Sequence, residues 1–317
     1  YECISCTMKL YQNEDAGISN ARTCCSLDDV ADARAIAYKL GMKFYVFNLS
    51  DSFDSFRDTV IRKFVDSYER GVTPNPCIDC NRYMKFERLY ERAKILGCDY
   101  IVTGHYARIE KTDGKYVLKK ALDETKDQSY VLYSLTQEQL AHTLFPLGNM
   151  KKTEVRAAAE EAGFVNANKP DSQDICFVPN SDYASVIELQ TGRKSVAGNF
   201  IDKYGNILGT HKGIIHYTVG QRKGLGISSD ALLYVCKIDP QSGNIVLGSN
   251  DELLSREVTA VEFNWISGDA PKGDFRCKAK VRYRQTEQWA TAFPLGEDTV
   301  RILFAESNHT RTSSGAI

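Results

Sequence analysis

The sequence predicts an α/β fold class, with a mostly parallel, doubly wound sheet in the N-terminal part followed by two small β-rich domains. In the first half of the chain, strand-like apolar runs alternate with helical stripes, the pattern of a parallel sheet covered by helices. After about Thr191 glycines become frequent, the helical stripes disappear, and short strand-like runs follow one another. We therefore expect domains at residues 1–192, 193–256 and 257–317.

Each helix expected in the N-terminal part has apolar residues three or four positions apart and a glycine near its end. We expect strands within residues 1–10, over 44–49 and over 100–103, and a hairpin over 108–119 around Asp113 and Gly114. The first helix is expected over 28–40, with a capping box at Ser26 and Asp29 and a stripe of Val30, Ala33, Ala37 and Leu40. A second helical stripe, Phe56, Val60, Phe64 and Tyr68, ends near Gly71, and a third helix is marked by Phe86, Leu89, Ala93 and Leu96. In the C-terminal part the strand-like runs are residues 214–219, 232–238 and 276–284.

The composition is that of an ordinary globular protein. Hydrophobic residues make up 43% and charged residues 26%, and 40 basic against 41 acidic side chains give a net charge of -1. Any nucleic-acid contact must therefore come from local basic patches. The sequence has no apolar run long enough to span a membrane and no secretory signal pattern, and its ten cysteines are typical of reduced thiols. We expect a cytoplasmic protein without membrane contact.

The strongest chemical signal is a C-x-x-C pair, Cys77 and Cys80, that follows two prolines in the segment 73–81. We expect Cys80 where the next helix begins, close to Arg82 and Lys85. A helix N-terminus and nearby cations both favour thiolate over thiol, which makes Cys80 a candidate nucleophile or metal ligand. A zinc knuckle, a thioredoxin-like redox pair and two structural cysteines remain open alternatives.

Weaker signals lie further along the chain. Cys176 stands between Ile175 and Phe177 and suits either a reactive thiol or a small buried side chain. Gly104 and His105 follow the expected strand 100–103, at the sheet edge where doubly wound proteins bind ligands. A tight turn there is an equally good explanation.

Basic residues alternate with small, apolar or aromatic ones in the segment 276–284. In a strand this period puts Arg276, Lys278, Lys280, Arg282 and Arg284 on one face, and Cys277, Ala279, Val281 and Tyr283 on the other. Such a ladder of cations suits a phosphate backbone.

Together these segments resemble the tRNA-specific 2-thiouridylases of the MnmA family. The resemblance extends from Tyr1 to about Glu306 and is carried, in order, by R-T-C-C-S-L-D-D at 22–29, T-P-N-P-C-I-D-C-N at 73–81, T-G-H-Y-A-R at 103–108, K-D-Q-S-Y at 126–130, L-F-P-L-G at 144–148, D-S-Q-D-I-C-F at 171–177, H-Y-T-V-G-Q-R-K-G at 216–224 and R-Y-R-Q at 282–285. It implies an adenine nucleotide α hydrolase-like (PP-loop) domain, a central β-rich domain and a C-terminal β-barrel that binds tRNA.

The resemblance also implies an activity, the ATP-dependent transfer of sulfur to C2 of the wobble uridine, with Mg²⁺ accompanying ATP. Its tRNA substrates would be those for Lys, Glu and Gln, and a sulfur-relay donor or a cysteine desulfurase would supply the sulfur. Cys176 would carry a persulfide, and Cys80 would release the product and leave a Cys80–Cys176 disulfide. The remaining implied contacts are Asn75, Pro76 and Cys77 with the target base, Met8 and Gly104 with the nucleotide, and His105, Lys126, Asp127, Gln128, Arg282 and Tyr283 with tRNA.

The sequence departs from the family pattern in three places. Cys77 stands where many members carry Asp, so Cys77, Cys80 and Cys176 also suit a [4Fe–4S] cluster, a rival to the persulfide. The family's S-G-G-x-D-S phosphate loop would precede Tyr1, so we expect the chain as given to lack most of its ATP site. The family's T-P-G-Q segment is not found after Glu306. Two other functions stay open, a catalytically inactive tRNA-binding fragment and an Fe–S or thiol redox protein.

Overall fold

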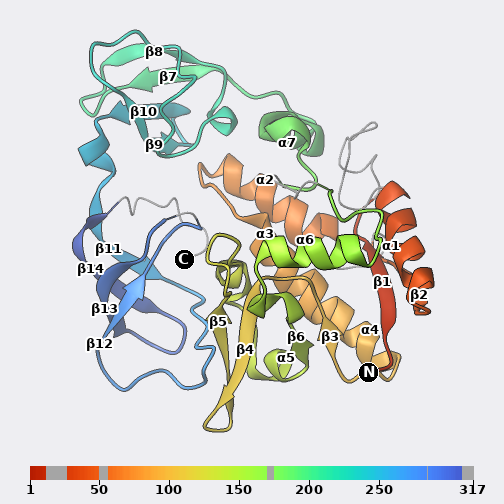
Figure 1. Ribbon diagram of the computed structural model, residues 1–317. Helices are drawn as coiled ribbons and strands as arrows, with labels where there is room; N and C mark the ends of the chain where they lie inside the picture. The colour runs from red at the N-terminus through yellow and green to blue at the C-terminus, as the bar shows by residue number, and fades with distance from the viewer. Residues whose placement is uncertain (12–26, 50–55, 170–174, 284, 309–317) are drawn as a thin grey trace. The chain divides into compact units, whose positions relative to one another are not determined.

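The structure is a computed structural model that describes residues 1–11, 27–49, 56–169, 175–283 and 285–308. The chain forms two compact units, one of Tyr1–Ile61 with Pro76–Asp182 and the other of Arg62–Asn75 with Tyr183–Ile317 (Figure 1). No helix in the described ranges is long and apolar enough to cross a membrane. The expected cap Ser26, most of the segments 22–29 and 171–177, Arg284 and the end of the chain lie outside the described residues.

The first unit alternates helices with short strands, as expected. Its elements are β1 (Ile4–Lys9), α1 (Leu27–Lys39), β2 (Lys43–Asn48), η1 (Arg57–Ile61), α3 (Pro76–Asp79), η2 (Cys80–Arg88), α4 (Leu89–Ile95), β3 (Ile101–Val102), β4 (Ala107–Thr112), β5 (Lys115–Lys120), η3 (Ser129–Leu132), α5 (Gln137–Ala141), β6 (Thr143–Leu144), η4 (Pro146–Asn149), α6 (Lys152–Glu161) and η5 (Pro179–Ser181). β1 pairs with β2 and β3 with β6, both in parallel, while β4 and β5 form an antiparallel hairpin. The turn residues Asp113 and Gly114 have φ of 50° and 82°, as a tight two-residue hairpin turn requires.

The helix that carries the C-x-x-C pair begins earlier than the sequence suggested. α3 starts at Pro76, and the helical path continues through η2 and α4 to Ile95. Proline suits a first helical turn because the missing N–H would have no partner there. Cys80 therefore lies a turn inside the helix rather than at its start. Leu96, expected on the apolar stripe, is 39% exposed because it lies beyond the last helical turn.

The other expected stripes are largely confirmed. Phe56, Val60, Phe64 and Tyr68 are all buried along η1 and α2 (Arg62–Glu69). In α1, Ala37 is buried and Val30 and Ala33 are half-buried. Leu40 was wrongly assigned to that stripe, since it follows the helix and is 50% exposed.

The second unit contains two four-stranded sheets. Its elements are α2, α7 (Tyr183–Thr191), β7 (Gly198–Ile201), β8 (Ile207–His211), η6 (Ile214–His216), β9 (Tyr234–Asp239), β10 (Asn244–Gly248), η7 (Asn250–Leu253), β11 (Ser255–Ala260), β12 (Phe275–Ala279), β13 (Gln288–Pro294) and β14 (Val300–Asn308). The sheet orders are β8-β7-β10-β9 and β11-β14-β13-β12. Each sheet has its own apolar core, centred on Phe200, Val235 and Ile245 in the first and on Val300 and Phe304 in the second.

α2 packs within the second unit. The Tyr183 ring lies 6.1 Å from the Phe64 ring and 6.0 Å from the Tyr68 ring, between centroids. Gly71 approaches β9 so closely that a Cβ there would lie 2.9 Å from the Ile238 side chain. A segment from the first half of the chain thus completes the hydrophobic contacts of the second unit.

Two strand expectations in this unit need correction. Residues 214–219 do not form a strand, because Gly213, with φ of 124°, starts the short turn η6. The expected strand over 276–284 ends at Ala279. The expected run 232–238 does contain a strand, β9.

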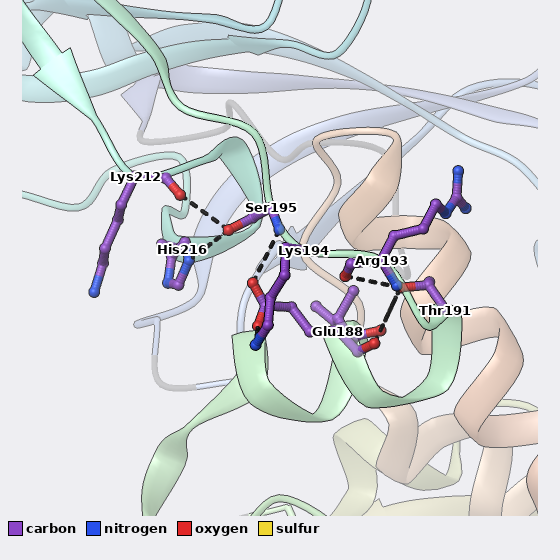
Figure 2. Close-up of polar contacts among 8 residues, drawn as sticks. Glu188, Thr191, Arg193, Lys194, Ser195, Lys212 and His216 are labelled. Carbon is purple, nitrogen blue, oxygen red and sulfur yellow. Dashed lines mark hydrogen bonds and ion pairs between the residues drawn. The ribbon is translucent and has the colours of Figure 1, made fainter.

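The connection between α7 and β7 is fixed by side-chain hydrogen bonds (Figure 2). Ser195 Oγ donates to the Lys212 carbonyl at 2.9 Å, so the 3.0 Å contact with His216 Nε2 has the imidazole as donor. The Ser195 amide donates to the Glu188 carboxylate at 2.9 Å, and Lys194 Nζ binds the same carboxylate at 2.7 Å. The hydrogen bond from Lys194, followed by that from the Ser195 amide, lowers the pKa of Glu188 to about 2. The Glu188 carboxylate and the Lys194 ammonium group therefore both stay charged from neutral to acidic pH.

Candidate active site

The C-x-x-C pair lies on the partly buried helix formed by α3 and η2. Asn81 is 3% exposed, and its Nδ2 donates to the Cys77 carbonyl at 2.9 Å. Its Oδ1 is buried and has no hydrogen-bond partner among the described residues. A buried acceptor of this kind suits the N–H of a ligand or a water molecule. Sequence reasoning missed Asn81, although a polar residue four positions after Cys77 on a buried helix is a usable signal.

The two thiols of this helix have different surroundings. Cys77 keeps exposed surface, yet enough protein atoms surround its sulfur that burial raises the pKa of the thiol, while Lys85 lowers it by a smaller amount. Cys80 is half-buried. At Cys77 desolvation outweighs the cation, so the helix start does not produce a thiolate there.

Cys176 is positioned by an aromatic cluster. Tyr11 Oη donates to the Cys176 carbonyl at 2.9 Å, and the Tyr11 ring stacks on Phe56 with 5.3 Å between centroids. Phe56 in turn packs edge-on against Phe177, which is 1% exposed. The backbone that follows the thiol is therefore held, while Cys176 itself is half-buried. The sequence offered no signal for the part played by Tyr11.

The same cluster connects Cys176 to the C-x-x-C helix. Phe56 leads directly into η1, and η1 packs against α3 and η2, which carry Cys77 and Cys80. Within the described ranges no three His, Cys, Asp or Glu side chains are grouped so that they could hold a metal ion. The [4Fe–4S] cluster expected on Cys77, Cys80 and Cys176 stays a prediction, because residues 170–174, next to Cys176, lie outside the described residues.

His105 is buried rather than displayed to solvent. Its side chain is 7% exposed, its ring lies 5.8 Å from Phe86 and 5.7 Å from Phe145, and its Nδ1 is 2.7 Å from Thr103 Oγ1. Burial, helped by the charge of Lys85, lowers the pKa of His105 to about 3. The imidazole is neutral at physiological pH and fixes the turn after β3.

The burial of His105 predicts an acid-sensitive stability. Unfolded histidine takes up a proton near pH 6.5, whereas folded His105 resists protonation down to about pH 3. Above about pH 6.5 His105 is neutral in both the folded and the unfolded state, so it adds no pH dependence. As the pH falls below this value only the unfolded state takes up the proton, and the free energy of unfolding should fall by about 1.4 kcal/mol per pH unit. Urea unfolding at several pH values gives the free energy of unfolding as a function of pH. Between about pH 3 and 6.5, the slope of this free energy against pH should be shallower in His105→Gln by this amount. His142→Gln is the control, and an unchanged slope in His105→Gln would contradict the buried neutral imidazole.

Two hydrogen bonds, one of them to the Gln128 side chain, join the segments around Tyr106 and Gln128. Gln128 Oε1 accepts from the Tyr106 amide at 3.0 Å, and the Gln128 amide donates to the Tyr106 carbonyl at 2.8 Å. Asp127 is 9% exposed and accepts from the Ala121 amide at 3.0 Å and from Ser129 Oγ at 2.8 Å. Asp127 and Gln128 thus shape this loop, and Lys126 beside them is half-buried.

A glycine of the segment 144–148 closes this region. A Cβ on Gly148 would lie 1.8 Å from the Ala107 carbonyl oxygen in β4. The Gly148 carbonyl accepts from the Leu122 amide at 2.8 Å. Only a residue without a side chain fits this close to the backbone of β4.

The basic segment behaves as expected only up to the end of β12. Arg276 and Lys278 are exposed and lie over the Trp289 ring, at 4.6 and 5.4 Å from its centroid. Beyond β12 the expected alternation is wrong, because Arg282 and Tyr283 are both exposed. The reason is a turn, in which the Gln285 amide donates to the Arg282 carbonyl at 3.1 Å. Tyr283 is therefore exposed, whereas the simple alternation would turn it inward, and its contact with tRNA stays a prediction.

Comparisons with known proteins identify the family of the chain. Family models match the chain as a tRNA methyl transferase HUP domain at residues 1–180, a tRNA methyl transferase PRC-barrel domain at 188–249 and an aminomethyltransferase beta-barrel domain at 255–312. The chain is 46% identical over 319 residues to the tRNA-specific 2-thiouridylase MnmA of Clostridioides difficile strain 630, covering 100% of this chain and 87% of that protein. It is 48% identical over 307 residues to the protein of the same name from Acetivibrio thermocellus, covering 96% of this chain and 85% of that protein. The chain belongs to the MnmA family.

The MnmA domain order confirms the expected fold class, a HUP domain followed by two small β-rich domains. The PRC-barrel match contains β7 to β10, and the beta-barrel match contains β11 to β14.

A HUP domain of the MnmA family implies ATP binding. Met8 lies near the carboxyl end of β1, and Gly104 follows β3, the two positions where ligands of parallel sheets bind. A Cβ on Gly104 would make only an ordinary contact with Leu147 at 3.6 Å, so packing within the chain does not require glycine here. The two residues belong to separate strand pairs, β1–β2 for Met8 and β3–β6 for Gly104, and their contact with a nucleotide stays a prediction.

Proposed function

We propose that this MnmA-family chain transfers sulfur to C2 of the wobble uridine of tRNAs for Lys, Glu and Gln. The observation that carries the proposal is the chain of contacts from Cys176 through Phe56 and η1 to the helix of Cys80. Relatives that align with nearly the whole chain are named tRNA-specific 2-thiouridylases, which supports the same conclusion.

The chemistry requires an activated carbonyl and two thiols. ATP, with Mg²⁺, transfers AMP to the O2 oxygen of the uracil and releases pyrophosphate, because a carbonyl oxygen is otherwise a poor leaving group. The terminal sulfur of a persulfide on Cys176 attacks C2, and AMP departs. The Cys80 thiolate then attacks Sγ of Cys176 and breaks the S–S bond, which leaves sulfur on C2 and a Cys80–Cys176 disulfide. A cellular thiol reduces the disulfide, and a sulfur-relay protein or a cysteine desulfurase renews the persulfide.

The other site residues bind and position the substrates in this proposal. Asn75, Pro76 and Cys77 line the target base, and the unpartnered Oδ1 of Asn81, beside the Cys77 carbonyl, suits the uracil N3–H. Met8 and Gly104 contact the nucleotide.

The tRNA contacts fall into two groups. Lys126, Arg282 and Tyr283 reach the tRNA directly. His105, Asp127 and Gln128, expected to touch it, act by shaping the turn and loop that they hold.

Nucleoside analysis tests the activity. The protein that contains this chain, given ATP, a persulfide donor and a tRNA for Lys, should form 2-thiouridine that mass spectrometry detects after nuclease digestion. Omitting ATP should abolish the product, and a tRNA without uridine at the wobble position should gain no sulfur. A protein that binds these tRNAs but forms no ATP-dependent 2-thiouridine would contradict the proposal and favour a binding role.

A further inference from the structure

The segment 216–224 belongs to no role described so far, although its turn is firmly built. The Gly220 amide donates to the Val235 carbonyl at 2.8 Å, and the Val235 amide donates to the Gln221 carbonyl at 2.9 Å. The Gln221 side chain bridges the turn, accepting from the Thr218 amide at 3.0 Å and donating to the Lys223 carbonyl at 3.0 Å. The backbone that carries the next two residues is thus fixed against β9.

These two residues, Arg222 and Lys223, are exposed cations. Within the described part of the chain neither side chain forms a hydrogen bond or an ion pair. Other cations of this unit are paired, such as Lys203 with Glu252 at 3.0 Å. Two adjacent cations without an acidic partner on a rigid turn suit an external anion.

A third cation reaches the same turn from the C-terminal sheet. Gly220 has φ of +90°, and a Cβ there would lie 3.4 and 3.7 Å from the two terminal nitrogens of Arg282. The glycine therefore allows the turn and leaves room for the guanidinium. Arg282 follows β12, so the two β-rich domains contribute to one surface within the second unit.

We propose that Arg222, Lys223 and Arg282 form one phosphate-binding surface that holds the sugar–phosphate backbone of tRNA across the two β-rich domains. The proposal rests on the proposed function for its partner. Arginine binds phosphate oxygens through two parallel hydrogen bonds, and a fixed turn reduces the entropy lost when the cations are ordered. Because backbone contacts carry no base information, the surface binds different tRNAs alike.

Filter-binding titrations over a salt series test this surface with unmodified tRNA. In Arg222→Gln/Lys223→Gln the log–log salt slope should become shallower by about 1.4–1.8, the value for two lost phosphate contacts. The loss of affinity should be the same for tRNAs with different anticodons. Lys203→Gln/Lys272→Gln, which removes two exposed lysines from the same unit, is the charge-matched control and should keep the parental slope.

The outcomes separate this surface from the proposed function. If the parent protein binds tRNA without thiolating it, and the Arg222/Lys223 variant binds tRNA more weakly, the result would support the surface and contradict the sulfur transfer. An active parent whose Arg222/Lys223 variant keeps its slope would overturn the surface alone. A control variant that loses slope to the same extent would also overturn it, since net charge would then explain binding.

Discussion

Cys80→Ser and Cys176→Ser should form no 2-thiouridine in a single round of reaction without reductant, while both bind tRNA like the parent. A serine hydroxyl cannot carry a persulfide and cannot displace sulfur from one. The tRNA contacts should survive because they depend on charges elsewhere, such as Arg282 and Lys126. Nucleoside mass spectrometry and filter binding measure the two properties separately.

The two variants should fail at different steps. Cys176→Ser stops before sulfur reaches the base. Cys80→Ser should accumulate tRNA joined through C2–S–S to Cys176, which a non-reducing gel shows as a slower band and dithiothreitol removes. Absence of this adduct in an active preparation would contradict the assigned role of Cys80.

Two further cysteine variants serve as controls. Cys98→Ser changes another half-buried cysteine of the first unit and should keep activity. Cys77→Asp introduces the residue that many family members carry and should also keep activity if a persulfide is the sulfur source. A loss as complete as that of Cys80→Ser would favour the three-cysteine cluster instead.

Gly148→Ala should destabilise the first unit more than other single methyl additions. The new Cβ would lie 1.8 Å from the Ala107 oxygen and 2.6 Å from its carbonyl carbon, so β4 itself would have to move. Overpacking against backbone costs about 3 kcal/mol or more, which lowers the melting temperature by roughly 6–12 °C in a domain of this size.

Gly104→Ala is the matched control for this substitution. Its Cβ would meet only the Leu147 side chain at 3.6 Å, so the free energy of unfolding should change by no more than about 0.5 kcal/mol, as in an ordinary surface variant. Differential scanning calorimetry compares the melting temperatures of Gly148→Ala and Gly104→Ala. Equal melting temperatures would show that the backbone of β4 shifts at little cost in free energy.

Much of the fold could be predicted from local sequence patterns. The helical stripe from Phe56 to Tyr68 and the Asp113-Gly114 turn depend on neighbouring residues alone, and the structure confirms both. The strand expected at 214–219 failed because Gly213 redirects the backbone, which apolar periodicity does not record.

The candidate site was less predictable because its geometry depends on distant contacts. The residues around Cys80 and Cys176 were visible as motifs, but the hydrogen bond from Tyr11 to Cys176 joins segments 165 positions apart. The burial of His105 likewise depends on Phe145, which lies on another element. Sequence spacing alone contains neither distance.

The packing of α2 has a consequence for dissecting the protein. The chain enters the second unit at Arg62, returns to the first at Pro76, and enters the second again at Tyr183. A fragment cut at Tyr183 would leave that ring without Phe64 and Tyr68 and would uncover Ile238 where Gly71 packs. We therefore expect that the second unit does not fold intact as a simple C-terminal piece, because a helix encoded within the first half of the chain completes it.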